Sequence, residues 1–447
     1  MSSPPAPGPG SAQLTVPQEM GGVRAGVIVF AGIASANLGN YVFHLVSARY
    51  LGPDEYGDVA TLAALTGLVG LPLAGVQVVV ARHTARLVAR ERREEVADFA
   101  RRALALAALA GIALTTFGLA LAPFVQRALS IGSAWAVVFT ALFTLTAFVS
   151  PVVWGLAQGL QRFDVFALSL GAGPIFRIAI VVATFAAGWG VTGALGATFF
   201  AAVIGVAVPL LALREFFLVD RKIRLHAGRA QVMAVMPVLG GLLAITALST
   251  DDLLVAKSTF AGETAGIYGS ASLIGKVILY LPAAIVTVLL PKVSARQAMS
   301  RDTTNILSAS VVVTACFCAV AIAAYALVPD FIVGLAFGDE FDRAAGLLWM
   351  FGLSMSGFAI LNVVLAYHLG RGSTALSWLL LAGAILQAVG FAFFHATPRE
   401  LLSVNIATSG LLLIAHELLI DHTLLRTALF AVQAIRSGRR SAFWSRA

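Results

Sequence analysis

Residues 231–296 decide the fold of this chain and read QVMAVMPVLGGLLAITALSTDDLLVAKSTFAGETAGIYGSASLIGKVILYLPAAIVTVLLPKVSAR. Two apolar runs, 232–250 and 267–290, flank a short charged hairpin. Because an α-helix rises about 1.5 Å per residue, about 20 apolar residues cross the hydrocarbon core of a bilayer, and both runs reach that length. The stretch therefore predicts a membrane-spanning helical hairpin with charges inside it.

Composition extends this interpretation to the whole chain, because 59% of its residues are hydrophobic and only 12% are charged. Soluble domains carry about 25% charged residues, so we expect a multi-pass protein of the cell (inner) membrane. The net charge of +8 would suggest nucleic-acid binding in a soluble chain. Here the basic residues lie in short loops between apolar runs, which indicates membrane topology and contact with anionic lipids, not nucleic acid.

The apolar runs predict an all-α polytopic membrane protein with twelve transmembrane helices. The first six cover residues 25–49, 56–81, 103–126, 134–159, 164–187 and 191–213. The second six cover residues 231–256, 265–291, 305–329, 344–369, 374–395 and 401–421. We therefore divide the chain into a disordered cytoplasmic tail (1–21), an N-terminal lobe (22–216), a cytoplasmic linker (217–230), a C-terminal lobe (231–424) and a basic amphipathic tail (425–447).

The distribution of cations sets the expected orientation. Most of the 30 Lys and Arg residues lie in connections on the side of the N-terminus, and both termini should therefore be cytoplasmic. The connections on the other side carry only Arg49, Arg127, Lys257, Arg343 and Arg399. Within the basic connection 82–102, apolar residues recur at near-helical spacing, which predicts a helix lying on the membrane surface.

A weak internal repeat relates the two halves at an offset of about 210 residues. Gly57 corresponds to Gly266, and each follows a short acidic outer hairpin. The helices that follow lead into similar segments, Thr-Ala-Arg at 84–86 and Ser-Ala-Arg at 294–296. Since six is an even number, both halves keep one orientation, and the repeat predicts a pseudo-twofold axis along the membrane normal with a pathway between the lobes.

Three short motifs carry a resemblance to a known family. They read LGPDEYG at 51–57, GIY at 266–268 between Asp252 and Pro291, and FGDEF at 337–341 followed by Ala344 and Ala345. Over residues 22–425 the chain resembles the oligosaccharide (O-antigen type) flippases of the multidrug/oligosaccharidyl-lipid/polysaccharide exporter superfamily. The resemblance implies two six-helix lobes around a cavity lined by helices 1, 2, 7 and 8. It also implies that a polyprenyl-diphosphate oligosaccharide moves from the inner to the outer leaflet by alternating access, for cell-surface polysaccharide assembly with glycosyltransferases or a polymerase of the same pathway.

Arg177 and Lys276 are the two cations that the pattern places near mid-membrane. A charge there costs at least ~2.5 to 3.5 kcal/mol on insertion scales, so both should face the bundle interior or a wet cavity. Given the resemblance, we expect them to share a cavity and hold the diphosphate, Arg177 through its fork and Lys276 as a point charge. Arg24 is a further candidate contact. A structural ion pair or a hydrogen bond to a carbonyl is the alternative for both mid-membrane cations.

The first helix aligns four polar side chains on one face, because Asn37, Asn40, Tyr41 and His44 are spaced i, i+3, i+4 and i+7. This face suits hydrogen bonds to sugar hydroxyls. Hydrogen bonds between helices are the alternative.

Asp251 and Asp252 lie at the outer end of the seventh helix. They form either a coupling site for a proton or sodium gradient or a solvated helix end. The resemblance implies a single acid at this place, so the doublet leaves open which of the two acts.

Two other classes of function compete with the flippase. A multidrug exporter of the same superfamily would share the fold, but it would favour acids and aromatics in the cavity over paired cations. A membrane glycosyltransferase or polymerase would need a sizeable outer loop with catalytic acids, which these short connections leave no room for. We find no phosphate loop, metal-ligand cluster or nucleophile constellation, and we expect a non-enzyme without catalytic residues, bound metal or cofactor.

Overall fold

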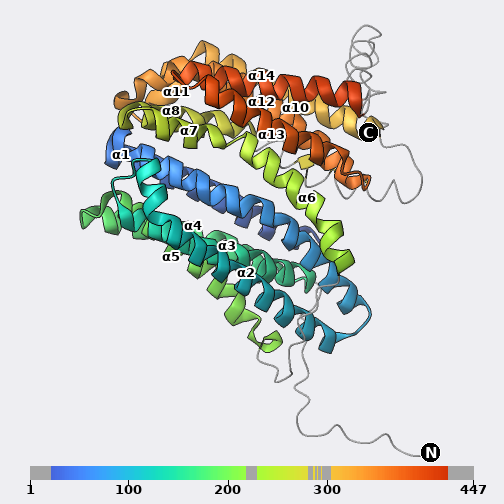
Figure 1. The fold of residues 1–447 in the computed structure, drawn as a ribbon. Coiled ribbons are helices and arrows are strands. Elements are labelled where there is room, and N and C mark those ends of the chain that lie inside the picture. The colour runs from blue at the N-terminus through green and yellow to red at the C-terminus, as the bar shows by residue number, and fades with distance from the viewer. Residues whose placement is uncertain are drawn as a thin grey trace, which may run out of the picture.

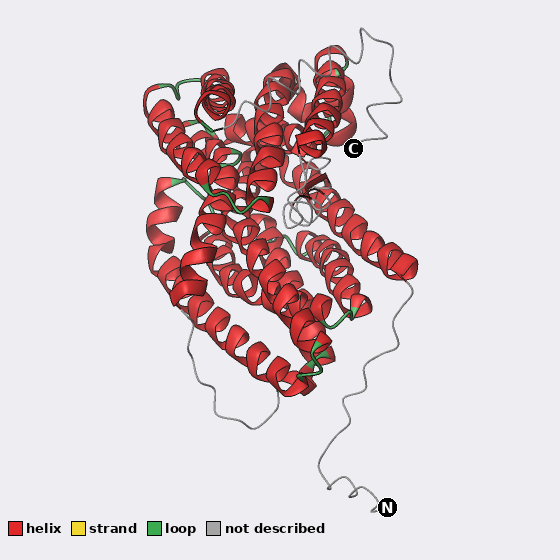
Figure 2. Cartoon of the chain, turned by 90° about the vertical axis from the view of Figure 1, so that its right-hand side faces the viewer, coloured by secondary structure: helices red, strands yellow, loops and turns green. Residues whose placement is uncertain are grey.

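The computed structural model describes residues 22–217, 229–279, 285, 286, 289, 293 and 304–420. The expected tails (1–21 and 425–447) lie outside these residues, as does most of the expected linker. Throughout the described part, the chain forms helices joined by short turns, with no strand (Figure 2).

The first lobe contains α1 (Gly22–Ala89), α2 (Arg93–Ala128), α3 (Ala134–Gly159), α4 (Phe163–Ala186) and α5 (Gly190–Ala212), followed by the short η1 (Arg214–Phe216). At Gly52, α1 bends where the backbone adopts φ 71° and ψ 175°. Glycine reaches this positive-φ conformation without the strain that a Cβ would cause. The bend divides α1 into two membrane spans, as the expected connection between helices 1 and 2 requires.

The second lobe begins with α6 (Arg229–Leu248), α7 (Asp251–Thr259), α8 (Gly262–Gly275) and η2 (Lys276–Leu279). It continues with α10 (Thr304–Leu327), α11 (Pro329–Ala336), η3 (Asp339–Leu347), α12 (Leu348–Gly370), α13 (Ala375–Phe393) and α14 (Pro398–Leu419). The expected single helix 231–256 is a broken span, because α6 and α7 meet at an angle of 40°. This break places the Asp doublet at the start of α7.

Two bundles of helices face each other in Figure 1, one built from α1 to α5 and the other from α6 to α14. Helix α1 runs along the side of the first lobe that meets the second, and it packs against α6, α7 and α8. Within the described residues, nine helices are long and apolar enough to span a membrane, or ten with the bent α6 and α7 pair, and the longest of them, α1, is divided by the bend. The predicted two-lobed, all-helical membrane fold is confirmed.

The connection 82–102 does not form a separate surface helix, so that prediction was wrong. Helix α1 continues to Ala89, a tight turn follows, and α2 begins at Arg93. Apolar residues that suggested a membrane-bound face instead pack between helices. Val96 joins a buried cluster with Leu156 and Phe166, and Val88, Phe99 and Ala103 pack against that cluster. An amphipathic pattern shows that one face is apolar, but whether lipid or protein covers that face depends on tertiary packing.

Candidate functional site

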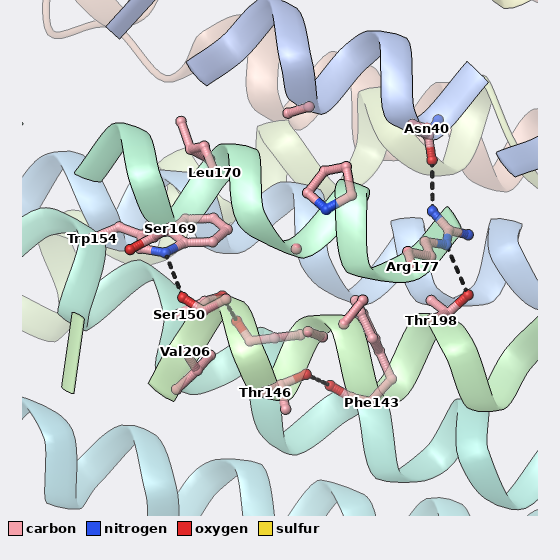
Figure 3. Close-up of a pocket in the computed structure, with 17 residues that line it drawn as sticks. Asn40, Phe143, Thr146, Ser150, Trp154, Ser169, Leu170, Arg177, Thr198 and Val206 are labelled. Carbon is pink, nitrogen blue, oxygen red and sulfur yellow. Dashed lines mark hydrogen bonds between the residues drawn. The ribbon is translucent and has the colours of Figure 1, made fainter. Parts of the chain in front are cut away.

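Arg177 joins three helices of the first lobe. It lies on α4, and its Nε donates a hydrogen bond to Thr198 Oγ1 on α5 at 3.1 Å. Its Nη1 donates to Asn40 Oδ1 on α1 at 2.9 Å (Figure 3). The guanidinium carbon also lies 3.3 Å from the centre of the Phe43 ring, in a cation–π contact. These contacts fix the orientation of the planar group.

The guanidinium retains capacity for a ligand. An arginine carries five N–H donors. Among the described residues, only its Nε and Nη1 have protein acceptors, which leaves Nη2 able to donate to an anion. Arg177 therefore has structural hydrogen bonds and also a free donor. The structural role and the anion-binding role that the sequence suggested for it are compatible.

A cavity of about 290 Å³ extends from Arg177 through the interior of the first lobe, between α1, α3, α4 and α5. Figure 3 shows Asn40, Arg177 and Thr198 at one end, and Trp154 with Ser169 at the other. Most of the lining is apolar, and hydroxyl groups of Thr146, Ser150 and Ser169 are set into it. Lys276 does not line this cavity, which lies within the first lobe. The sequence pattern gave no sign of a pocket beside Arg177 inside one lobe.

The four residues of the predicted polar face on the first helix differ in their contacts and exposure. Asn40 holds Arg177, whereas His44 is buried and its Nδ1 lies 3.2 Å from the Tyr56 hydroxyl. Asn37 is exposed and Tyr41 is half-buried. Asn40 and His44 thus make the contacts within the protein that the helix-joining alternative required. The side chain of Arg24 lies outside the described part of the structure.

Lys276 occupies the point where α8 ends and η2 begins. Its side chain is partly buried, and it makes no hydrogen bond or ion pair with another residue that the structure describes. It acts electrostatically on His44, as Arg177 also does. The two mid-membrane cations therefore lie within electrostatic range of one side chain on α1.

Asp252 is fully buried and strongly hydrogen-bonded. Its Oδ2 accepts hydrogen bonds from the Tyr268 hydroxyl at 2.7 Å and from Asn405 Nδ2 at 3.1 Å, and its Oδ1 accepts from the Leu253 amide at 3.0 Å. A solvated helix end is therefore excluded for Asp252. The break between α6 and α7 turns this residue towards α8 and α14 instead of the solvent.

Asp251 occupies the next position with different partners. Its Oδ1 accepts a hydrogen bond from Gln387 Nε2 at 2.7 Å, and the same nitrogen donates to the Leu248 carbonyl at 2.9 Å. Asp251 is partly exposed, in contrast to Asp252.

Two buried amide oxygens complete this cluster. Asn405 Oδ1 and Gln387 Oε1 have no hydrogen-bond partner among the described residues. Carboxylate and amide oxygens are the ligands that hard cations prefer. No group of three or more His, Cys, Asp or Glu able to hold a metal occurs within the described ranges, so this cluster depends on its amides. The sequence analysis missed Tyr268, Gln387 and Asn405 as site residues, although polar residues inside apolar helices were a usable signal.

Comparison with known proteins adds a family and a fold. Residues 23–297 match the family described as "Polysaccharide biosynthesis protein". Among curated proteins, none matches this sequence.

Three solved structures are similar to the chain. An inward-facing multidrug resistance MATE family transporter of the MOP superfamily has 16% identity and a TM-score of 0.64, with 91% of this chain and 98% of that chain covered. An outward-facing structure of such a transporter has 16% identity and a TM-score of 0.56, with 91% and 95% covered. A MOP superfamily transporter from Pyrococcus furiosus Vc1 (DSM3638) has 17% identity and a TM-score of 0.58, with the same coverage. At these identities the matches show the fold alone.

Proposed function

Because the chain belongs to the polysaccharide biosynthesis protein family, we propose that it flips a lipid-linked oligosaccharide across the cell membrane. The substrate is an oligosaccharide on a polyprenyl diphosphate, and it moves from the inner to the outer leaflet by alternating access. Enzymes of the same pathway, glycosyltransferases before and a polymerase after, supply and consume it. The protein itself breaks no bond and needs no cofactor.

The open Nη2 of Arg177 is the observation that carries this proposal. A guanidinium held rigidly by Asn40 and Thr198 presents its remaining donors at a fixed place, which favours the planar oxygen pairs of a phosphate. Lys276 adds a second positive charge without a contact partner in the described residues. Lys276 also lies within electrostatic range of Asp251 and Asp252. A diphosphate would bring negative charge to both cations in an apolar bundle, where a lone charge is costly.

The cavity beyond Arg177 supports a role in holding the glycan. Thr146 and Ser169 donate their hydroxyl protons to carbonyls of their own helices, Phe143 and Val165 respectively. Their oxygen lone pairs remain able to accept hydrogen bonds from sugar hydroxyls. The Trp154 indole supplies an apolar surface at the same end of the cavity. A sugar next to the diphosphate would therefore meet both acceptors and an aromatic face.

We assign the coupling ion to the cluster around Asp252. A proton bound there would be carried by one of the two carboxylates, whereas a sodium ion would be coordinated by the carboxylates and the unpartnered oxygens of Asn405 and Gln387. We also propose loading from the cytoplasm, with both termini on that side, because most Lys and Arg residues lie in the connections of that side.

A multidrug exporter is the second candidate, because the fold matches MATE transporters and the lining of the cavity is mainly apolar. The two candidates differ in their dependence on the cations. Export of a lipophilic cation gains nothing from Arg177 and Lys276, since like charges repel.

The test is translocation of a lipid-linked oligosaccharide in proteoliposomes. Arg177→Gln removes charge-assisted hydrogen bonds worth about 1.5 to 3 kcal/mol each, so flipping should fall about tenfold or more. Lys276→Gln should impair it as well. Arg162→Gln is the matched control, because Arg162 lies at the start of the same helix and pairs with the exposed Asp164. Normal flipping by the Arg177→Gln/Lys276→Gln double variant would reject the proposed role of the two cations. Export of a cationic dye by the wild type and equally by the double variant would favour the multidrug exporter.

A further inference from the structure

The two glycines related by the internal repeat meet each other between the lobes. A Cβ added to Gly57 on α1 would lie 3.1 Å from the Gly266 amide nitrogen on α8. A Cβ added to Gly266 would lie 1.5 Å from the Pro53 carbonyl oxygen, which leaves no space for any side chain. Equivalent positions of a twofold pair contact each other only at the axis that relates them. The pseudo-twofold axis thus passes through a direct backbone contact between the lobes.

An ion pair lies beside this contact. Lys257 Nζ on α7 is 2.6 Å from Asp58 Oδ1 on α1, and both side chains are buried. Asp58 Oδ2 also accepts a hydrogen bond from the Gly132 amide, in the turn between α2 and α3, at 3.0 Å. Asp58 is therefore anchored to the first lobe, while Lys257 belongs to the second.

Aromatic packing seals the same end of the molecule, the end that holds the bend at Gly52. Tyr56 is fully buried, and its ring centre lies 5.7 Å from that of Phe337 and 6.0 Å from that of Phe341 in the second lobe. Arg49 Nη2 donates a hydrogen bond to the Leu335 carbonyl at 2.7 Å. The lobes are thus closed against each other at the Gly52 end.

We propose that the Asp58 and Lys257 ion pair is the latch of an outer gate, which must separate before the pathway opens to the outside. The proposal rests on the alternating access of the proposed function and on the orientation expected from the cation distribution, which places the Gly52 bend outside, but not on the substrate. In the closed state, each charge is buried and neutralised by the other. If one member is removed, the other charge is left buried without its partner, which destabilises the closed state strongly. In the open state the remaining charge is hydrated, so neutralising either residue shifts the population towards opening.

A disulfide can report closure of this gate directly. A Cβ added to Gly262 would lie 1.5 Å from Asp54 Oδ1 and 2.8 Å from Asp54 Cγ. Cysteines at these two positions, Asp54→Cys and Gly262→Cys, should therefore approach the Cβ separation of about 3.5 to 4.5 Å that a disulfide requires. The chain must first be freed of Cys316 and Cys318 by substitution with serine.

Three results are expected of the double-cysteine protein in proteoliposomes. Oxidation should crosslink it and stop flipping, and a reductant should restore flipping. Asp58→Asn or Lys257→Gln, added singly, should slow crosslinking by about tenfold, because each leaves an unpaired buried charge. The combined Asp58→Asn/Lys257→Gln variant leaves no unpaired charge, so its crosslinking rate should return towards that of the parent. This recovery would not follow if the single variants were merely misfolded.

Arg343→Gln is the matched control. Its ion pair with Glu263 lies at the same end, but the two side chains are 70% and 60% exposed, and such pairs stabilise little. The latch would be refuted by failure to crosslink, by flipping that continues in the crosslinked protein, or by unchanged crosslinking in both single variants. Crosslinking needs no substrate, so a gate that behaves as expected in a protein that flips no oligosaccharide would overturn only the proposed substrate.

Discussion

Replacing Asp252 by alanine or by asparagine should separate the structural role of this residue from its role in coupling. Asp252 accepts three hydrogen bonds, from Tyr268, Asn405 and its neighbour Leu253. Asp252→Ala leaves the Tyr268 hydroxyl and the Asn405 amide group buried without an acceptor. Each unsatisfied donor costs about 1 to 3 kcal/mol, so the fold should lose roughly 2 to 6 kcal/mol of stability.

Asp252→Asn should be far milder, because the site can rearrange around it. The Tyr268 hydroxyl is both donor and acceptor, so it can accept from the new amide group. The Asn405 side chain can rotate and present its Oδ1, which has no partner in the described structure, to the same amide. We therefore expect a loss of about 1 to 3 kcal/mol, the difference between charged and neutral hydrogen bonds.

Thermal unfolding in detergent measures the first effect, and flipping with and without an imposed proton or sodium gradient measures the second. The expected pattern is a folded Asp252→Asn protein whose flipping no longer responds to the gradient, beside an unstable Asp252→Ala protein. Ser258→Ala is a suitable control, since Ser258 lies on α7 but is exposed. If Asp252→Ala unfolded like the wild type, the hydrogen-bond argument would be wrong. If Asp252→Asn kept its gradient response, Asp252 would have no part in coupling.

Arg177→Lys keeps the charge but loses the planar group that bonds to both Asn40 and Thr198, so flipping should fall partially. Full activity of this variant in the proteoliposome assay would argue against geometric recognition. In the wild type, rising salt should weaken substrate binding. A cysteine that replaces Arg90, in the exposed turn between α1 and α2, or Arg224 should react with a thiol label only from the cytoplasmic side. Labelling from outside intact cells would show that the expected orientation is wrong. Gly266→Ala should prevent closure at the Gly52 end, because its Cβ would lie 1.5 Å from the Pro53 carbonyl oxygen. Crosslinking of the cysteines at positions 54 and 262 should then become slow. Gly334→Ala should leave the crosslinking rate unchanged, because no heavy atom lies within 4 Å of its added Cβ.

The sequence by itself determined the membrane spans and their grouping into two lobes. Apolar length is a local property, and the thickness of the bilayer converts it directly into helices. The expected boundaries of α3, α4 and α5 therefore agree with the structure to within one residue at either end. The correspondence of Gly57 with Gly266 was also visible in the sequence, because both halves repeat the same hairpin.

The tertiary structure alone decided what each polar side chain contacts. Periodicity shows which residues share a face of a helix, but the neighbour of that face depends on how helices distant in sequence pack. Arg177 and Asn40 lie far apart in the chain, and so do Asp252 and Asn405. The 40° break after α6 accompanies the burial of Asp252, whose place in the sequence also fitted a solvated helix end. Lys257 counted only as a loop cation in the sequence, and it became half of a buried ion pair because the approach of the two lobes brought Asp58 to it.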